Sequence, residues 1–219
     1  MGNVGSLMPS NAKNSFTRAL ADVDNLLWFH ENEGGYGQGR RAAHFQSLNK
    51  SAIVLLCAAW ETYIETVIVE CVDRNVDAAN APADMLRPIQ KITQSHIREG
   101  RVENAWISVA GDGWKDLTRS LVKGRVAALN TPKPGPVTEL MKAVLGLDDI
   151  KDNWTWHRNP LGTPADKLRD FVSLRGAIAH GEQPEHSVTK AKVTQAYDLV
   201  SRLVDCVETN LAEAGLLDA

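Results

Sequence analysis

The sequence has no apolar run long enough to cross a membrane. Its longest uninterrupted apolar stretch covers nine residues, 52–60, whereas a membrane-spanning helix needs about 20 consecutive apolar residues. The beginning of the sequence also lacks the basic segment followed by an apolar segment that is typical of a secretory signal. We therefore expect a cytoplasmic protein without a membrane partner.

Cysteines are few and odd in number, which argues against a disulfide framework. The chain has three, Cys57, Cys71 and Cys206, and each lies in an apolar segment, so we expect reduced thiols in the interior. Four histidines lie away from cysteines and acidic residues at the spacing of metal ligands: His44, His96, His157 and His186. The sequence therefore predicts neither a metal site nor a cofactor.

Strand signals are also missing, because no segment alternates apolar and polar residues and no Asn-Gly hairpin occurs. Apolar residues instead recur at three- and four-residue steps, which predicts an all-α fold. The expected helices cover residues 11–32, 40–78, 83–95, 112–129, 137–144, 163–181 and 187–214, and prolines break the chain at 131–136. We expect one domain over residues 1–219, an antiparallel helical bundle of about 11–80 and 164–214 with an inserted helical region at about 81–160.

The second expected helix is too long for a compact bundle of this size. At 1.5 Å per residue it extends for roughly 58 Å, more than the ~30–35 Å diameter of a compact chain of this length. Either it kinks or part of it packs outside a single compact core. Its segment 52–60 is apolar around the whole circumference, which predicts burial on all sides, at the centre of the bundle or in a subunit interface.

Positive charge is concentrated in the middle of the chain. The net charge is −3 overall, and it is −3 over residues 1–80, +4 over 81–135 and −4 over 136–219. The basic excess makes the middle region the candidate for RNA binding outside a catalytic pocket, with these residues as candidates: Arg87, Lys91, Arg119 and Lys123. A solvated helical surface with a modest basic excess explains the same pattern.

Two tryptophans, Trp154 and Trp156, lie in an irregular stretch at residues 148–164. Their indole rings could stack on nucleic-acid bases. Alternatively, they pack against the bundle and cover its core, and the sequence leaves both interpretations open.

One helical segment, LRDFVSLRGAIAHG at residues 168–181, contains an arginine in its apolar face. At 100° per residue, Arg175 falls in the middle of the face that Leu168, Phe171, Val172 and Ile178 form. An unpaired guanidinium there costs several kcal/mol and cannot lose its proton. Arg175 therefore needs an acidic partner such as Glu61 or Glu65, a water-filled cleft or a ligand.

His180 lies at the end of the same helix, before Gly181, which we expect to form a left-handed cap. The negative end of the helix dipole favours a charged imidazole, and the positive charge of Arg175 opposes it, which suits a histidine that transfers protons. The alternative is a histidine that only bonds a free carbonyl at the helix end. Arg175 and His180 are separated by ~140° around the helix axis, so they border one cleft but do not clamp one phosphate.

Two copies of this helix around a twofold axis would place two arginines and two histidines at one pocket. Such a pocket suits cleavage of a phosphodiester, with His180 removing the proton from a 2′-hydroxyl and Arg175 neutralising charge at phosphorus. The second histidine would protonate the leaving 5′-oxygen. The expected products are a 2′,3′-cyclic phosphate and a 5′-hydroxyl, formed without a metal ion.

The motif RGAIAHG at residues 175–181 resembles the signature of the HEPN superfamily, an Arg and a His separated by four to six residues near a helix end. The segment LNKSAIVLLCAAWETYIETVIVE at 48–70 is similar to the long helix of the RiboL-PSP-HEPN branch, which is associated with RNA-repair operons. The likeness extends over roughly residues 40–75 and 164–212. It implies a bundle that dimerises through the motif helix and a ribonuclease that acts in toxin–antitoxin, phage-defence or RNA-repair settings, with RNA and a cognate antitoxin or operon partner as ligands.

The resemblance also implies roles for single residues. Arg175 and His180 match the catalytic pair of the family, and Glu61 lies where members often carry an acidic residue that supports the arginine. Gly176 differs from the polar residue, often Asn, that follows the arginine in active members. A non-catalytic HEPN module that binds a protein partner or a nucleotide is therefore the alternative function.

Overall fold

The structure is a computed structural model, which describes residues 9–32, 40–100, 105–181 and 187–218. The described residues contain no β-strand and form two short 3₁₀ helices, Pro82–Asp84 and Ile150–Asn153, and eight α-helices. The α-helices are α1 (Asn11–Asn32), α2 (Arg40–Ala78), α3 (Arg87–Arg98), α4 (Ala105–Val109), α5 (Gly113–Val126), α6 (Pro134–Leu145), α7 (Thr163–Ala179) and α8 (Lys190–Glu213). The all-α prediction is confirmed.

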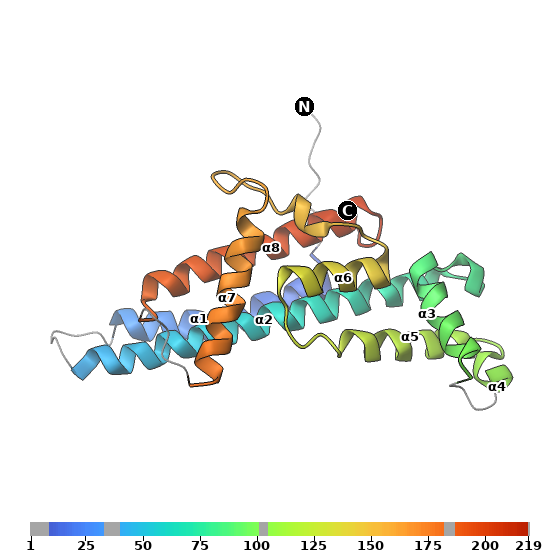
Figure 1. Cartoon of the computed structure of the whole chain (residues 1–219), viewed down its shortest axis with the longest axis horizontal. Coiled ribbons are helices and arrows are strands. Elements are labelled where there is room, and N and C mark those ends of the chain that lie inside the picture. The colour runs from blue at the N-terminus through green and yellow to red at the C-terminus, as the bar shows by residue number, and fades with distance from the viewer. Residues whose placement is uncertain (1–8, 33–39, 101–104, 182–186, 219) are drawn as a thin grey trace.

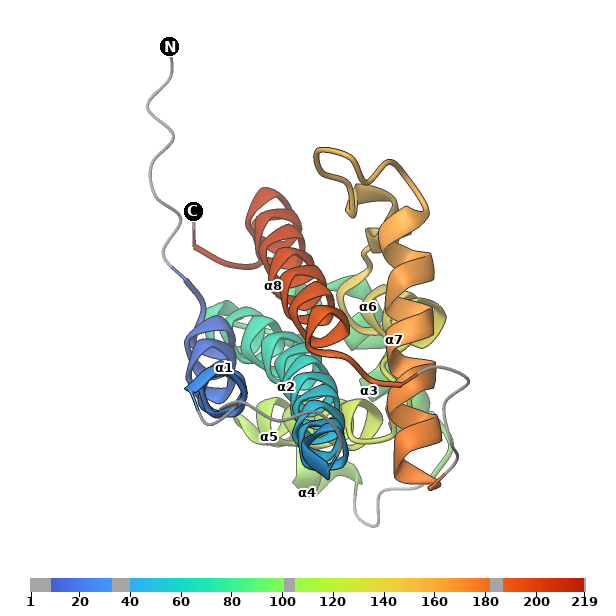
Figure 2. The same cartoon turned by 90° about the vertical axis from the view of Figure 1, so that its left-hand side faces the viewer.

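Helix α2 is the axis of the molecule and extends along most of its length (Figure 1). Viewed from the end where α2 begins, α1, α8 and α7 surround it (Figure 2), and it also contacts α5 and α6. It is one uninterrupted helix of 39 residues. Its C-terminal half stays within the one core: Glu70 bonds Asn11 at the start of α1, Arg74 bonds Asp218 after α8, and Asp73 pairs with Arg119 on α5.

The prediction that segment 52–60 is buried on all sides is wrong within one chain. Ile53, Leu56 and Trp60 have no exposed surface, but Leu55 is 37% exposed and Ala58 is also exposed. Both line a groove between α1 and α2. The cause is that α1 packs along only one side of α2 and leaves the small and apolar residues beside it uncovered.

Helix α2 also meets the length and composition of a membrane span, over Phe45–Ala78. The longest uninterrupted apolar run does not reveal this membrane-span composition, because isolated polar residues divide the apolar segments of the helix. In the folded chain 56% of its apolar window is buried inside the protein. This helix has the composition and the burial of a core helix in a soluble bundle.

Helix ends follow prolines and glycines more closely than the apolar pattern suggests. Helix α6 starts at Pro134, within the predicted break, because a proline in the first turn lacks only an N–H that has no partner there. The N-cap of α7 is Gly162, and Thr163 is the first helical residue. Thr189 is the N-cap of α8, and its Oγ accepts a hydrogen bond from the Lys192 backbone N–H at 3.3 Å.

Trp154 belongs to the core, so core packing, one of the two interpretations left open by the sequence, applies to this residue. It has no exposed surface, and its ring contacts Trp60 edge-to-face with 6.2 Å between centroids. The Trp60 indole N–H donates to the Pro132 carbonyl at 2.9 Å. These contacts attach the segment after α5 and the segment after α6 to the middle of α2.

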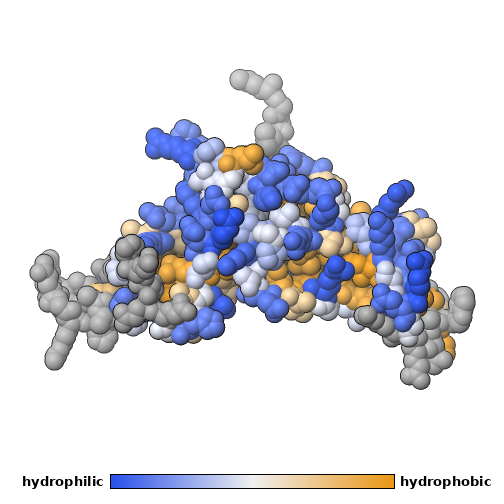
Figure 3. Space-filling model, viewed as in Figure 1, coloured by the Kyte–Doolittle hydropathy of each residue, from blue (hydrophilic) through white to orange (hydrophobic). Residues whose placement is uncertain are grey.

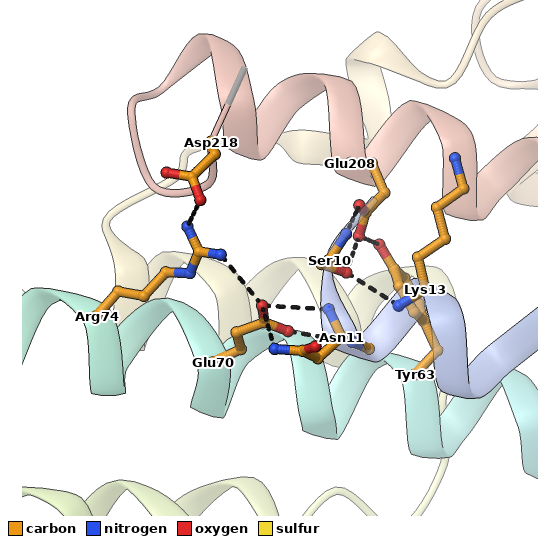
Figure 4. A network of polar contacts seen from close by, with 9 residues as sticks. Ser10, Asn11, Lys13, Tyr63, Glu70, Arg74, Glu208 and Asp218 are labelled. Atoms are coloured by element: carbon orange, nitrogen blue, oxygen red, sulfur yellow. Dashed lines mark hydrogen bonds and ion pairs between the residues drawn. The ribbon is translucent and has the colours of Figure 1, made fainter. Parts of the chain in front are cut away.

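A buried carboxylate on α8 joins three parts of the chain (Figure 4). Glu208, which is 6% exposed, accepts hydrogen bonds from the Ser10 backbone N–H at 3.1 Å, the Ser10 hydroxyl at 2.7 Å and the Tyr63 hydroxyl at 2.9 Å. Burial and Glu208 together raise the pKa of Tyr63 well above its ordinary value, so the phenol stays a donor. The start of α1 is thereby fixed to α2 and α8.

The buried thiols give the unfolding free energy a dependence on alkaline pH. Burial raises the pKa of Cys57 to about 11 and of Cys71 to about 12, from 9.0 in an exposed thiol. The native state therefore disfavours both thiolates. The buried neutral thiols make their full contribution to the unfolding free energy below pH 9, and this contribution is lost as the pH rises toward 11–12. We expect urea denaturation to show a loss of roughly 3 kcal/mol between pH 8 and pH 10. The double variant Cys57→Ala/Cys71→Ala should have a flatter profile, and an equally steep one would contradict the assignment.

Candidate functional site

The motif helix α7 crosses the face of α2, and its C-terminal end extends past it (Figures 1 and 2). Leu168, Phe171 and Val172 are buried against the core, so the predicted apolar face is the packed face. The helix ends where predicted, because Gly181 adopts a φ of 70° and its N–H donates to the Ile178 carbonyl at 3.2 Å. Arg175 and His180 therefore lie in the last two turns.

Arg175 lies near α2 and has no hydrogen-bond or ion-pair partner among the described residues. The residue is partly exposed, but its Nε is buried and has no hydrogen-bond partner. Among the described residues it forms no ion pair, so neither Glu61 nor Glu65 neutralises it, and the alternative of a structural salt bridge is not found. An unpaired buried guanidinium nitrogen is costly, and an anionic ligand would remove this cost.

The buried thiol of Cys57 on α2 lies close enough to Arg175 for its pKa to respond to the guanidinium charge. Burial raises the pKa of this thiol, the positive charge of Arg175 lowers it and the negative charge of Glu61 raises it further. Partial burial and Glu61 likewise raise the pKa of Glu65. Arg175 and the predicted supporting residue Glu61 thus both affect the pKa of Cys57 on α2, but they form no ion pair with each other.

His180 is the C-cap of α7 and is exposed. Its backbone N–H donates to the Gly176 carbonyl at 3.0 Å. The imidazole ring forms no hydrogen bond with the residues that the structure describes, so the alternative of a side chain that bonds a helix carbonyl is not found. The ring is accessible to a substrate or to a second subunit.

Arg175 and His180 lie outside the best-defined cavities of the described residues, since neither side chain lines the cavities beside α1, between α3, α5 and α6, or between α7 and α8. Their separation of ~140° around the α7 axis directs one toward α2 and leaves the other at the helix end. A single subunit therefore presents two separate groups.

Gly176, next to Arg175, leaves open space. A Cβ built at this position would meet no atom within 4 Å outside its own helix, and its backbone is helical. An alanine side chain therefore fits here. The glycine is not required for close packing.

We expect Gly176→Ala to raise the unfolding free energy by about 0.5–1 kcal/mol. The reason is that glycine loses more backbone entropy than alanine when it becomes helical. Urea denaturation of both proteins measures the difference. Gly124→Ala on α5, which also has open space, is the matched control and should give a similar gain. A loss of stability specific to Gly176→Ala would show that the glycine has a packing role.

The predicted RNA-binding residues lie away from the motif. Arg87 and Lys91 on α3 and Lys123 on α5 are exposed, at positions displaced from α7 along the molecule (Figure 1). Lys91 lines a cavity of about 670 Å³ between α3, α5 and α6. The structure does not bring these residues together with Arg175 and His180.

Arg119 on α5 differs from the other three because carboxylates surround its guanidinium. It bonds Asp73 at 3.2 Å, Asp116 at 3.4 Å and Asp77. Two of these partners belong to α2. In this arrangement Arg119 attaches α5 to α2, and its charge is largely compensated.

A cavity of about 720 Å³ between α7, α8 and the turn at residues 156–159 has no counterpart among the sequence predictions. Its lining comes from separate parts of the chain, so no local motif could have indicated it. The only signal was Trp156, for which base stacking remained one of two interpretations. Unlike Trp154, Trp156 is partly exposed and borders this cavity.

Comparison with known proteins identifies one family. The family model RiboL-PSP-HEPN matches residues 30–213, which is 184 of the 219 residues and includes α2, α7 and α8. No curated protein and no solved structure matches the chain.

Proposed function

Since the chain belongs to the RiboL-PSP-HEPN family of the HEPN superfamily, we propose that it is a metal-independent endoribonuclease that uses Arg175 and His180. The observation that carries this proposal is the isolated guanidinium of Arg175. Its buried Nε has no partner and no carboxylate of the described chain compensates its charge. An RNA phosphate would supply both the hydrogen bonds and the negative charge.

The active form in this proposal is a homodimer that pairs two α7 helices. Arg175 and His180 of one subunit are too far apart around the helix to act on one phosphate alone. A twofold axis near the exposed end of α7 would bring two guanidiniums and two imidazoles to a shared pocket. The exposure of His180, and the absence of a partner for its side chain among the described residues, support this arrangement.

In the shared pocket one His180 removes the proton from a ribose 2′-hydroxyl, and the 2′-oxygen attacks the adjacent phosphorus. The bond to the 5′-oxygen breaks, and the second His180 gives that oxygen a proton. Arg175 compensates the charge that develops on the phosphoryl oxygens. The products are a 2′,3′-cyclic phosphate and a 5′-hydroxyl, and the proton transfers require no metal ion.

Glu61 has a supporting role in this proposal. Its carboxylate lies near the same α2 thiol as Arg175 and would orient the guanidinium when RNA enters. The proposed setting is the cytoplasm, in a toxin–antitoxin, phage-defence or RNA-repair system with a cognate antitoxin or operon partner.

Cleavage of end-labelled RNA in excess EDTA tests the proposed chemistry. We expect cleavage to continue with the chelator and to produce 5′-hydroxyl ends that polynucleotide kinase can phosphorylate directly. The 3′ ends should require removal of a cyclic phosphate before ligation. Loss of cleavage in EDTA, or products with 5′-phosphates, would contradict the mechanism.

A non-catalytic binding module is the second candidate, and Gly176 is the observation that favours it. Active members of the family often have a polar side chain after the arginine, whereas here the space is empty. Growth of cells that express the protein distinguishes the candidates. An active ribonuclease should slow growth and become harmless with His180→Ala, whereas a harmless wild type would favour the binding module.

A further inference from the structure

The cavity between α7, α8 and the turn at residues 156–159 has the volume of a small-molecule site. Its volume of about 720 Å³ lies in the range of roughly 300–1,000 Å³ that ligand pockets occupy. Helix α7 lines it with Lys167, Asp170, Phe171 and Leu174, which are spaced so that they share one helix face. Neither residue of the proposed catalytic pair lines it, so this cavity is a separate feature of the chain.

The interior of the cavity is formed by hydrocarbon side chains. Ile53, Phe171, Ala196 and Leu199 are buried and line it, together with the partly buried Leu174. None of these five side chains has a hydrogen-bonding group. A polar group that leaves water for this interior would lose its partners, so the part of a ligand that enters here has to be apolar.

Trp156 forms part of the wall. The Arg202 guanidinium lies over its ring, 6.0 Å from the centroid, where a cation interacts with the face of an indole. The side-chain oxygen of Asn159 accepts a hydrogen bond from the Lys167 ammonium at 2.5 Å. The wall and the interior therefore favour a hydrocarbon over a heterocyclic base, whose hydrogen-bonding edge would be left without partners there.

The rim of the cavity carries an excess of positive charge. Hydrophilic residues cover most of the outer surface at the turn and along α8 (Figure 3). Four cationic side chains line the cavity against two exposed carboxylates, and they are Arg158, Lys167, Lys192 and Arg202 against Asp170 and Asp198. None of the four cations forms an ion pair with a carboxylate in the part of the chain that the structure describes. Unpaired cations at the mouth of an apolar cavity favour an anionic ligand with an apolar body.

The turn that carries Arg158 is held in place. Trp156 and Asn159 exchange two backbone hydrogen bonds, of 3.2 and 2.8 Å, and Lys167 attaches the turn to α7 through Asn159. Arg158 has a φ of 64°, a strained conformation for a residue that is not glycine. The turn thus keeps Arg158 at the rim, while the side chains of Arg158 and Lys192 form no hydrogen bond with the described residues.

We propose that this cavity binds a carboxylate with a hydrocarbon body, of the class of medium-chain fatty acids. The chain would lie among the apolar side chains beside Trp156. The carboxylate would accept charge-assisted hydrogen bonds from Arg158 and Lys192 at the rim. This binding does not depend on the proposed nuclease activity, because it uses neither Arg175 nor His180.

Calorimetric titration of the full chain with octanoate, decanoate and decan-1-ol tests the proposal. We expect decanoate to bind about tenfold more tightly than octanoate, because two additional CH₂ groups leave water. Decan-1-ol has the same chain but no charge for the cations of the rim. It should therefore bind about tenfold or more weakly than decanoate.

Two variants separate the charged end of the ligand from its apolar body. Arg158→Gln/Lys192→Gln should weaken decanoate binding about tenfold or more and leave decan-1-ol binding unchanged. Leu174→Gln places a polar group in the interior and should weaken binding of both compounds. The matched control is Arg18→Gln/Arg169→Gln, which removes two exposed cations outside the cavity and should bind decanoate as wild type does.

Three outcomes overturn the proposal: no binding of decanoate, equal binding of decanoate by wild type and Arg158→Gln/Lys192→Gln, and binding of decan-1-ol as tight as that of decanoate. Displacement of decanoate by AMP would assign the cavity to a nucleotide and overturns the proposal as well. His180→Ala should bind decanoate as wild type does, so failure of the nuclease and failure of this site are distinguishable.

Discussion

His180→Ala is expected to lower the rate of RNA cleavage in EDTA by about 10²–10⁴-fold, the range that a positioned general acid or base contributes. The variant removes both the general base and the general acid of the proposed mechanism, because the His180 side chains of the two subunits take these two roles. The imidazole is exposed and forms no hydrogen bond within the described chain. Its loss should therefore leave the unfolding free energy within ~0.5 kcal/mol of wild type.

The control for this prediction is another histidine in a folded helix. His96→Ala on α3 removes an imidazole far from the motif and should retain cleavage close to the wild-type rate. Rates are compared under single-turnover conditions, so that the chemical step is measured and not product release. An unchanged rate in His180→Ala would remove the histidine from the mechanism.

Glu208→Ala is expected to lower the unfolding free energy by about 3–5 kcal/mol. The carboxylate accepts three hydrogen bonds from Ser10 and Tyr63 in a buried site (Figure 4). Truncation leaves two buried hydroxyls and a backbone N–H without their acceptor, and it also leaves a cavity. Because domains are stable by only about 5–15 kcal/mol, this change should be visible as a large shift of the urea midpoint.

Two further variants separate the hydrogen bonds from the loss of volume. Glu208→Gln keeps the shape and one carbonyl acceptor, so it should destabilise less than Glu208→Ala. Glu213→Ala, at an exposed position of the same helix, should change the unfolding free energy by less than ~0.5 kcal/mol. Equal stability of Glu208→Ala and wild type would show that the network in Figure 4 contributes nothing to the fold.

Much of the helical framework could be predicted from local signals. The bounds of α1 and α2 agree with the apolar periodicity, and Gly181 ends α7 as expected. Helix α4 was missed because its five residues are too few to show periodicity. Residues 33–39, between α1 and α2, lie outside the described residues, as do the side chains of His44 and His186.

The candidate site could be predicted only in part, because it depends on what faces each side chain. Periodicity alone located Arg175 in the apolar face of α7, but whether Glu61 or Glu65 paired with it depended on how α7 crosses α2. The exposure of Leu55 depended on how far α1 covers α2. The cavity beside α7 combines two helices and a turn, and such long-range packing leaves no pattern in a single segment.

Cleavage by a mixed dimer tests the composite site most directly. One subunit carries Arg175→Ala/His180→Ala and the other is wild type, each with its own affinity tag, and mixed dimers are purified through both tags and assayed at once in EDTA. The account predicts a rate near background, since one pocket needs groups from both subunits. A rate near half that of the wild-type dimer would show that each subunit has an independent site, and it would contradict the account.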